Sequence, residues 1–76
     1  MFKPLPTKCI EAFLKSLGFY YDRTVGSHDL WKKRGNWRSM PVRGNDKDMP
    51  AFHIRTCSKV TGYTTDQIYA WAQKNC

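Results

Sequence analysis

Apolar side chains near the start of the chain recur with the period of a helix. Four of them fall at i, i+3, i+4 and i+7: Ile10, Phe13, Leu14 and Leu17. This spacing predicts an amphipathic helix with one buried face. Thr7 is placed to cap its start, after an extended lead-in that contains two prolines, and Gly18 stands where a helix commonly ends.

The next part of the chain is rich in aromatic and β-branched residues and is interrupted by turn signals. It predicts three antiparallel strands over residues 19–25, 28–34 and 37–43. Gly26-Ser27 and Gly35-Asn36 form the two turns between them. In the second strand, alternation puts His28, Leu30 and Lys32 on one side and Asp29, Trp31 and Lys33 on the other. Pro41 favours an edge position for the third strand.

The last part predicts two helices after a polar loop at 45–49. Asp48 can cap the first, which has Pro50 in its first turn and runs to about Thr61, with Ile54, Cys57 and Thr61 facing inward. Thr64 and Gln67 have the spacing of a capping box, which starts a short last helix with Ile68 and Trp71 on its apolar face. We therefore expect a single α+β domain over residues 1–76: a helix, a three-stranded antiparallel sheet, a helix and a short C-terminal helix.

The distribution of charge along the chain indicates a polyanionic ligand. The chain has 13 Lys and Arg against 6 Asp and Glu, a net charge of +7, and eight of those cations lie between Lys32 and Lys59. Such a concentration favours nucleic acid or an acidic protein as partner. Trp31 and Trp37 are interleaved with the cations, and each could either stack on a base or fill the core. Trp71 fits the core, because it shares a helical face with Ile68.

The three cysteines are an odd number and lie far apart: Cys9, Cys57 and Cys76. They match neither a disulfide framework nor a zinc spacing, which predicts a reducing compartment. No signal peptide or membrane-spanning run is visible, so we expect a cytoplasmic protein. The two histidines do not complete a metal site with the cysteines, and no metal or other cofactor is expected. His53, near a helix start, is a poor cation there, so a surface or helix-start role is expected for it.

His28 is the candidate catalytic group. It follows the Gly26-Ser27 turn and begins the strand that leads into the basic run. Imidazole has the unperturbed pKa nearest neutrality, so it can take or give a proton with little tuning. The alternative from spacing alone is an ordinary hairpin whose second strand begins with histidine.

Several segments occur in an order that is similar to a known family. They are Leu17-Gly18-Phe19, Val25-Gly26-Ser27-His28, Met40-Pro41-Val42-Arg43-Gly44-Asn45, a helix that contains Ile54 and Cys57 and ends at Gly62, and Tyr63-Thr64-Thr65-Asp66-Gln67-Ile68. Over nearly its whole length the chain resembles the HicA toxins, mRNA interferases of bacterial toxin–antitoxin systems. The most specific piece is Gly-Ser-His after the first strand.

The resemblance implies a fold like that of double-stranded-RNA-binding domains. It also implies ribosome-independent cleavage of mRNA with His28 as the catalytic residue, and a HicB-like antitoxin protein that covers the active face. The chain departs from the family in its closing helix, which has Phe52 and His53 where smaller polar residues are usual. Family members also often carry a second histidine beside the first or in the Pro-Val-x-Gly segment. Here Asp29 and Arg43 occupy those places.

These inferences combine into a hypothesis of metal-independent RNA cleavage. His28 would act as general base on a ribose 2′-hydroxyl, with Lys32, Lys33 and Arg43 stabilising the phosphorane charge. The expected RNA-binding residues are Gly26, Ser27, Lys32, Lys33, Arg34, Arg38 and Arg43. The general acid is left open between Tyr20, Tyr21, a lysine and water. The alternatives are a non-catalytic RNA-binding module with the same basic sheet and an adaptor for an acidic protein.

Overall fold

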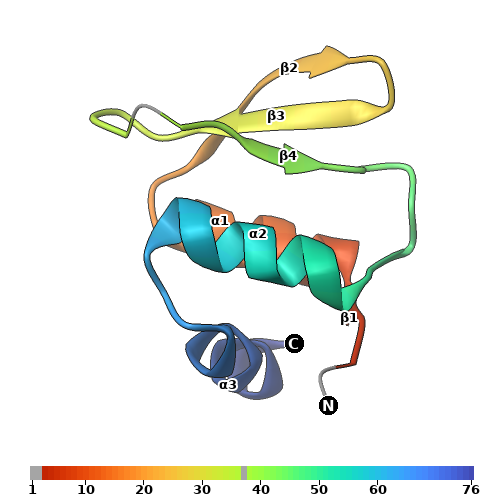
Figure 1. Ribbon diagram of the computed structural model, residues 1–76, viewed down its shortest axis with the longest axis vertical. Helices are drawn as coiled ribbons and strands as arrows, with labels where there is room; N and C mark the ends of the chain where they lie inside the picture. Colours follow the sequence, from red (N-terminus) through yellow and green to blue (C-terminus); the bar gives the residue numbers. More distant parts are fainter. Residues whose placement is uncertain (1–2, 37) are drawn as a thin grey trace.

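In the computed structural model, which describes residues 3–36 and 38–76, the helices lie on one side of an antiparallel sheet (Figure 1). The elements in chain order are β1 (Leu5–Pro6), α1 (Thr7–Ser16), β2 (Tyr20–Val25), β3 (His28–Lys32), β4 (Met40–Val42), β5 (Asp48–Met49), α2 (Ala51–Thr61) and α3 (Thr65–Asn75). Helices α1 and α2 form the layer next to the sheet, and α3 lies beyond them. The predicted α+β class and the order of helix, three strands and two helices are confirmed.

The main sheet has the order β2-β3-β4. Val25 pairs with His28, so Gly26 and Ser27 form a two-residue turn, as predicted. Gly26 has φ +62° and Ser27 does not have a positive φ, which is the pattern of a type II′ turn with glycine in its first central position. The pairing with β3 shifts register between Tyr21 and Arg23. Strand β4 lies at the sheet edge, where its proline is tolerated, and it is shorter than the predicted strand 37–43.

One core fills the space between the sheet and the helices. Its buried side chains come from all of the layers: Ile10, Phe13, Leu14, Phe19, Trp31, Met40, Val42, Met49, Ile54, Cys57, Val60 and Ile68. Trp31 is only 5% exposed, so it belongs to the core and does not present a face to a base. Trp37, the other tryptophan of the basic segment, lies outside the described residues. Trp71 packs against the core as expected.

The sequence predicted the C-terminal end of α1 correctly and its N-terminal cap incorrectly. At the C-terminal end Gly18, with φ +92°, donates to the Lys15 carbonyl, and Phe19 donates to that of Leu14. This is a Schellman motif, in agreement with the predicted glycine stop. The predicted cap is wrong: Pro6 holds the N-cap position, and Thr7 is buried as the first helical residue, where its backbone N–H donates to the Lys47 carbonyl at 2.9 Å.

That bond belongs to a second, two-stranded sheet that the sequence did not predict. Leu5 pairs with Met49 and Pro6 with Asp48, so the N-terminal lead-in pairs as a strand with the end of the predicted polar loop. Met49 is 1% exposed and is part of the core. Asp48 therefore does not cap α2, whose N-cap is Pro50. Two-residue strands have no periodicity, so only the contact between distant segments reveals them.

The two C-terminal helices confirm most of the pattern. Thr64 and Gln67 form the predicted capping box, with each side chain bonded to the other residue's backbone. Helix α3 has 11 residues, as many as α2, so it is not the short helix that was expected. On α2 Val60 is buried, whereas Thr61 is half-buried and donates its hydroxyl to the Cys57 carbonyl.

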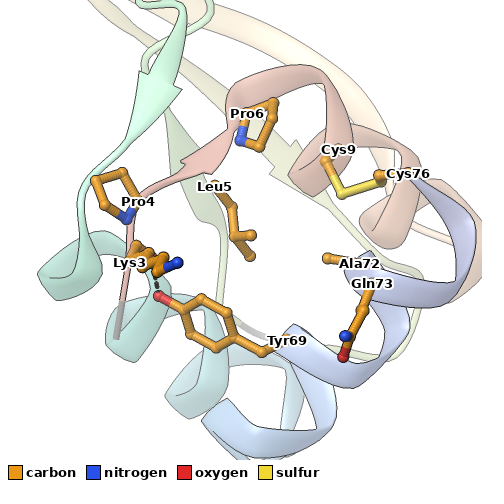
Figure 2. A pocket seen from close by; sticks show the side chains of 9 residues that line it. All are labelled: Lys3, Pro4, Leu5, Pro6, Cys9, Tyr69, Ala72, Gln73 and Cys76. Atoms are coloured by element: carbon orange, nitrogen blue, oxygen red, sulfur yellow. Dashed lines mark hydrogen bonds between the residues drawn. A yellow bond between two sulfur atoms is a disulfide. The ribbon is translucent and has the colours of Figure 1, made fainter. Parts of the chain in front are cut away.

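A disulfide joins Cys9 of α1 to Cys76 at the end of the chain, with 6.1 Å between their Cα atoms (Figure 2). The expectation that no cysteines pair is therefore wrong, because the fold brings together residues that are far apart in sequence. Cys57 stays a thiol, and burial raises its pKa to about 12, so it is unreactive in the folded protein. Across residues 3–36 and 38–76, no helix is both long and apolar enough to cross a membrane.

Candidate active site

His28 is half-buried at the first position of β3. The strand alternation that buries Trp31 against the helices directs His28, Leu30 and Lys32 to the other face of the sheet. Figure 1 shows the helices below the sheet, so this outer face is the open one. The turn at Gly26 and Ser27, both exposed, presents His28 at one end of that face.

Arg43 lies beside this end of the sheet. Strand β4 ends at Val42, which pairs with Asp29, and Arg43 follows in a tight turn that is closed by the bond from the Gly44 N–H to the Val42 carbonyl. The guanidinium is half-exposed, and its Nε lies 3.2 Å from a carboxylate oxygen of Asp46. The ion pair orients the arginine and leaves the rest of its donor fork available for an anion. His28, a proton acceptor, and Arg43, an anion-binding group, thus lie at the same end of the sheet.

The structure brings the second histidine to the same end. Helix α2 begins soon after β4, and His53 lies in its first turn, with the ring of Phe52 edge-on at 4.4 Å between centroids. Burial lowers the pKa of His53, the positive charges of His28 and Arg43 lower it further, and Asp46 opposes them. The two imidazoles are therefore within electrostatic reach of one another. Sequence reasoning missed this grouping, because no spacing in the chain signals that a strand start and a helix start will meet.

The remaining predicted cations lie at the far end of the sheet. Strand β3 has five residues, so its ends, His28 and Lys32, are four steps and roughly 13 Å apart at about 3.3 Å per residue. The group at the far end consists of Lys32, Lys33, Arg34 and Arg38. Lys32 pairs with Asp22 at 3.5 Å, and the Lys33 ammonium lies 6.0 Å from the ring centroid of Phe19. Lys32 and Lys33 are therefore not beside His28, contrary to the expected arrangement around one phosphate.

Between the two ends the outer face is mixed in character. Tyr20 pairs with Lys32 and is 51% exposed, and Arg23 pairs with Leu30. An exposed aromatic ring close to cations is typical of surfaces that bind single-stranded nucleic acid. The outer face, defined by Tyr20, Arg23, Val25, His28, Leu30 and Lys32, therefore connects the histidine end with the basic end.

Asp29 is separated from His28 by the sheet itself. It lies on the helix side, where the Thr24 hydroxyl donates to its carboxylate at 2.7 Å. Since that hydroxyl has a single hydrogen, the Tyr21 hydroxyl must donate to Thr24, 2.6 Å away. A Cβ on Gly44 would collide with the Asp29 carboxylate, so the turn after β4 packs closely on this group. Asp29 therefore has a structural role, and it does not flank the candidate base.

Glu11 provides a pH-dependent contribution to stability from the same region. Burial raises its pKa, and the nearby charge of Asp29 raises it further. A carboxyl group whose pKa is raised on folding lowers the free energy of unfolding of the protein as the pH rises from about 4.5 through the raised value. We expect Glu11→Gln to be more stable than the wild type at pH 7, by roughly 0.5 kcal/mol or less, because solvent screens the partly exposed group. Urea unfolding at pH 4 and pH 7 tests this; an equal difference at both pH values would contradict it.

A separate pocket lies elsewhere in the described part of the chain. It measures about 520 Å³, is mostly apolar, and opens between the N-terminal segment and α3, with the disulfide in its wall (Figure 2). The Tyr69 hydroxyl donates to the Lys3 carbonyl across it. None of the residues predicted for RNA binding or catalysis lines this pocket.

Within the described part of the chain, no group of three or more His, Cys, Asp or Glu side chains is arranged to hold a metal ion. The site is thus built from His28, His53 and Arg43, with Asp46 beside them and the basic end farther along the sheet.

No protein-family model matches the chain, and no match to it is found among the curated proteins or the solved structures.

Proposed function

We propose that this chain is an mRNA-cleaving endoribonuclease, a toxin similar to the HicA family with a fold like that of double-stranded-RNA-binding domains. The observation that carries the proposal is the position of His28 at one end of an open sheet face, with Arg43 at the same end in the turn that follows the neighbouring strand. A proton acceptor beside a fixed cation is what cleavage at a phosphodiester needs. The ordered resemblance of the chain's segments to that family supports the same conclusion.

In this mechanism His28 takes the proton from a ribose 2′-hydroxyl. The 2′-oxygen then attacks the adjacent phosphorus in line, and the bond from phosphorus to the 5′-oxygen breaks. The products are a 2′,3′-cyclic phosphate and a free 5′-hydroxyl, so the reaction consumes no water and needs no oxidant. Arg43, oriented by Asp46, stabilises the negative charge that builds up on the phosphorane oxygens.

The rest of the outer face would hold the RNA strand. A base can stack on Tyr20, and Lys33, Arg34 and Arg38 can contact phosphates beyond it. Because they lie more than about 13 Å from His28, these cations bind a different nucleotide from the one that is cut. The exposed turn residues Gly26 and Ser27 let the backbone of the RNA approach His28 closely.

The proposal includes a protein partner and a location. A HicB-like antitoxin would cover the outer face and exclude RNA from it. The toxin would act in the cytoplasm, where its mRNA substrate is translated and where the Cys9–Cys76 bridge would be exposed to reduction.

The test is incubation of purified protein with end-labelled RNA in the presence of EDTA. The wild type should cut the RNA and leave cyclic-phosphate ends, and His28→Ala should cut at least about 100-fold more slowly. His28 is half-buried, and its side chain makes no hydrogen bond to residues 3–36 or 38–76, so the variant should retain its circular-dichroism spectrum and melting temperature. Undiminished cleavage by His28→Ala, or complete loss of wild-type activity in EDTA, would contradict the proposal.

A second candidate is a non-catalytic RNA-binding module. It is favoured by the separation of Lys32, Lys33, Arg34 and Arg38 from His28, since these cations could bind RNA without any chemistry. Binding would weaken steeply with salt under both functions, because counterion release depends only on the cations. The presence or absence of cleaved product in the same incubation distinguishes the two.

A further inference from the structure

The proposed cleavage requires a second proton transfer. When the bond between phosphorus and the 5′-oxygen breaks, the leaving oxygen is an alkoxide, which is a poor leaving group until it is protonated. His28 is occupied with the proton of the attacking hydroxyl at that moment. Another group at the same end of the sheet must therefore supply the proton.

The fold argues against the tyrosines as this group. The Tyr21 side chain lies on the helix side of the sheet, where its ring packs against Trp31 and its hydroxyl donates to Thr24. Tyr20 is on the outer face, but it pairs with Lys32 at the far end of the strands. That is roughly 13 Å along the sheet from His28, farther than one phosphate can bridge.

The same distance argues against the lysines of the basic segment. Lys32 is at the last position of β3 and pairs with Asp22, and Lys33 lies beyond it over the ring of Phe19. Arg43 is at the correct end, but a guanidinium does not give up its proton in proteins. Neither the tyrosines nor the lysines of the basic segment are beside His28, which leaves water or another group at the histidine end of the sheet.

His53 is at that end. It lies in the first turn of α2, which follows β4 and the turn that contains Arg43 and Asp46. Figure 1 shows the hairpin turn, the end of β4 and the start of α2 along the same side of the molecule, with the hairpin at the top and the start of α2 in the helix layer below. His53 is half-buried, and Phe52 restricts its ring from one side. His53 belongs to the helix layer and His28 to the outer face, so a phosphate would touch both imidazoles at the end of the sheet, beyond the first residue of β3.

We propose that His53 is the general acid of the reaction, which donates a proton to the 5′-oxygen as its bond to phosphorus breaks. This inference rests on the proposed function. His28 gains the proton of the 2′-hydroxyl and His53 loses one, so the pair exchanges its protonation states in each turnover. Return of a proton from His28 to His53 through solvent restores the starting state.

The electrostatics of the site fit this role. Burial of the ring disfavours a proton on His53, His28 and Arg43 repel one as well, and Asp46 attracts one. The lowered pKa makes the imidazolium a stronger acid toward a poor leaving group. The negative charge of a bound phosphate acts in the opposite direction and favours the protonated form when RNA is present.

Two substrates with different leaving groups test the proposal. One is a short oligoribonucleotide, and the other is the same oligonucleotide ending in a 3′-(4-nitrophenyl) phosphodiester, whose nitrophenolate departs without a proton. We expect His53→Ala and His53→Gln to cut the first about 100-fold more slowly than the wild type, and the second less than 10-fold more slowly. His28→Ala should be slow on both. Thr56→Ala, one turn farther along α2, serves as the control for substitutions in this helix.

The outcomes separate the two proposals. If the His53 variants are equally slow on both substrates, or as fast as the wild type on both, His53 is not the general acid. If instead the wild type cuts neither substrate, or His28→Ala cuts both at the wild-type rate, the proposed function itself fails. Melting temperatures of the two His53 variants show that any loss is not due to unfolding, and the glutamine variant retains a side chain of similar size.

Discussion

Replacing Cys76 with serine should lower the free energy of unfolding by about 4 kcal/mol, because the Cys9–Cys76 bridge closes a loop across a sequence separation of 67. Such a cross-link removes conformational entropy from the unfolded chain. A domain of this length has a total stability of about 4–11 kcal/mol. The variant should therefore be close to unfolding at 37 °C.

Urea unfolding in oxidising and in reducing buffer measures this effect. The wild type should lose about as much stability on reduction as Cys76→Ser loses by substitution, and the variant should be insensitive to the reductant. A thiol count provides the control, since the oxidised protein should have one thiol, Cys57, which reacts only after unfolding. A reduced wild type as stable as the oxidised one would show that the bridge does not stabilise the fold.

Truncating Phe13 to alanine should cost about 3–5 kcal/mol. This ring is 2% exposed and meets two aromatic rings edge-on, Tyr63 at 5.7 Å and Trp71 at 5.3 Å between centroids. Its loss would leave a cavity where α1 packs on α3. Because a small domain has few alternative contacts, relaxation can fill little of that space.

Thermal and urea unfolding of Phe13→Ala would measure the loss. The matched control is Phe52→Ala, since Phe52 is 58% exposed on the first turn of α2 and should cost less than about 0.5 kcal/mol. If both alanine variants lost the same stability, Phe13 would not be the centre of the helix packing. The comparison also gives a baseline for substitutions next to His53.

The local features of the fold were predictable because each depends on residues close in sequence. The helix around Phe13 follows from four apolar positions, and its end follows from Gly18. The hairpin at Gly26 needs only a residue that tolerates a positive φ. The capping box of α3 needs two side chains three positions apart.

The errors have a common physical origin. Thr7 and Asp48 look like helix caps in the sequence, but the pairing of β1 with β5 takes both away from that role. Cys9 and Cys76 look unpaired until α3 packs on α1. Each of these contacts joins segments from different parts of the chain, and local sequence preferences do not indicate such contacts.

For this protein the sequence by itself determined the α+β class, the hairpin that presents His28, and the excess of positive charge. Those features depend on periodicity, turn chemistry and composition. Only the tertiary structure decided which charged groups share a site. It separated Lys32 and its neighbours from His28 by the length of a strand, turned Asp29 to the other face, and brought His53 to the histidine end. Distances between side chains on different elements are set by packing, and packing is a property of the whole chain.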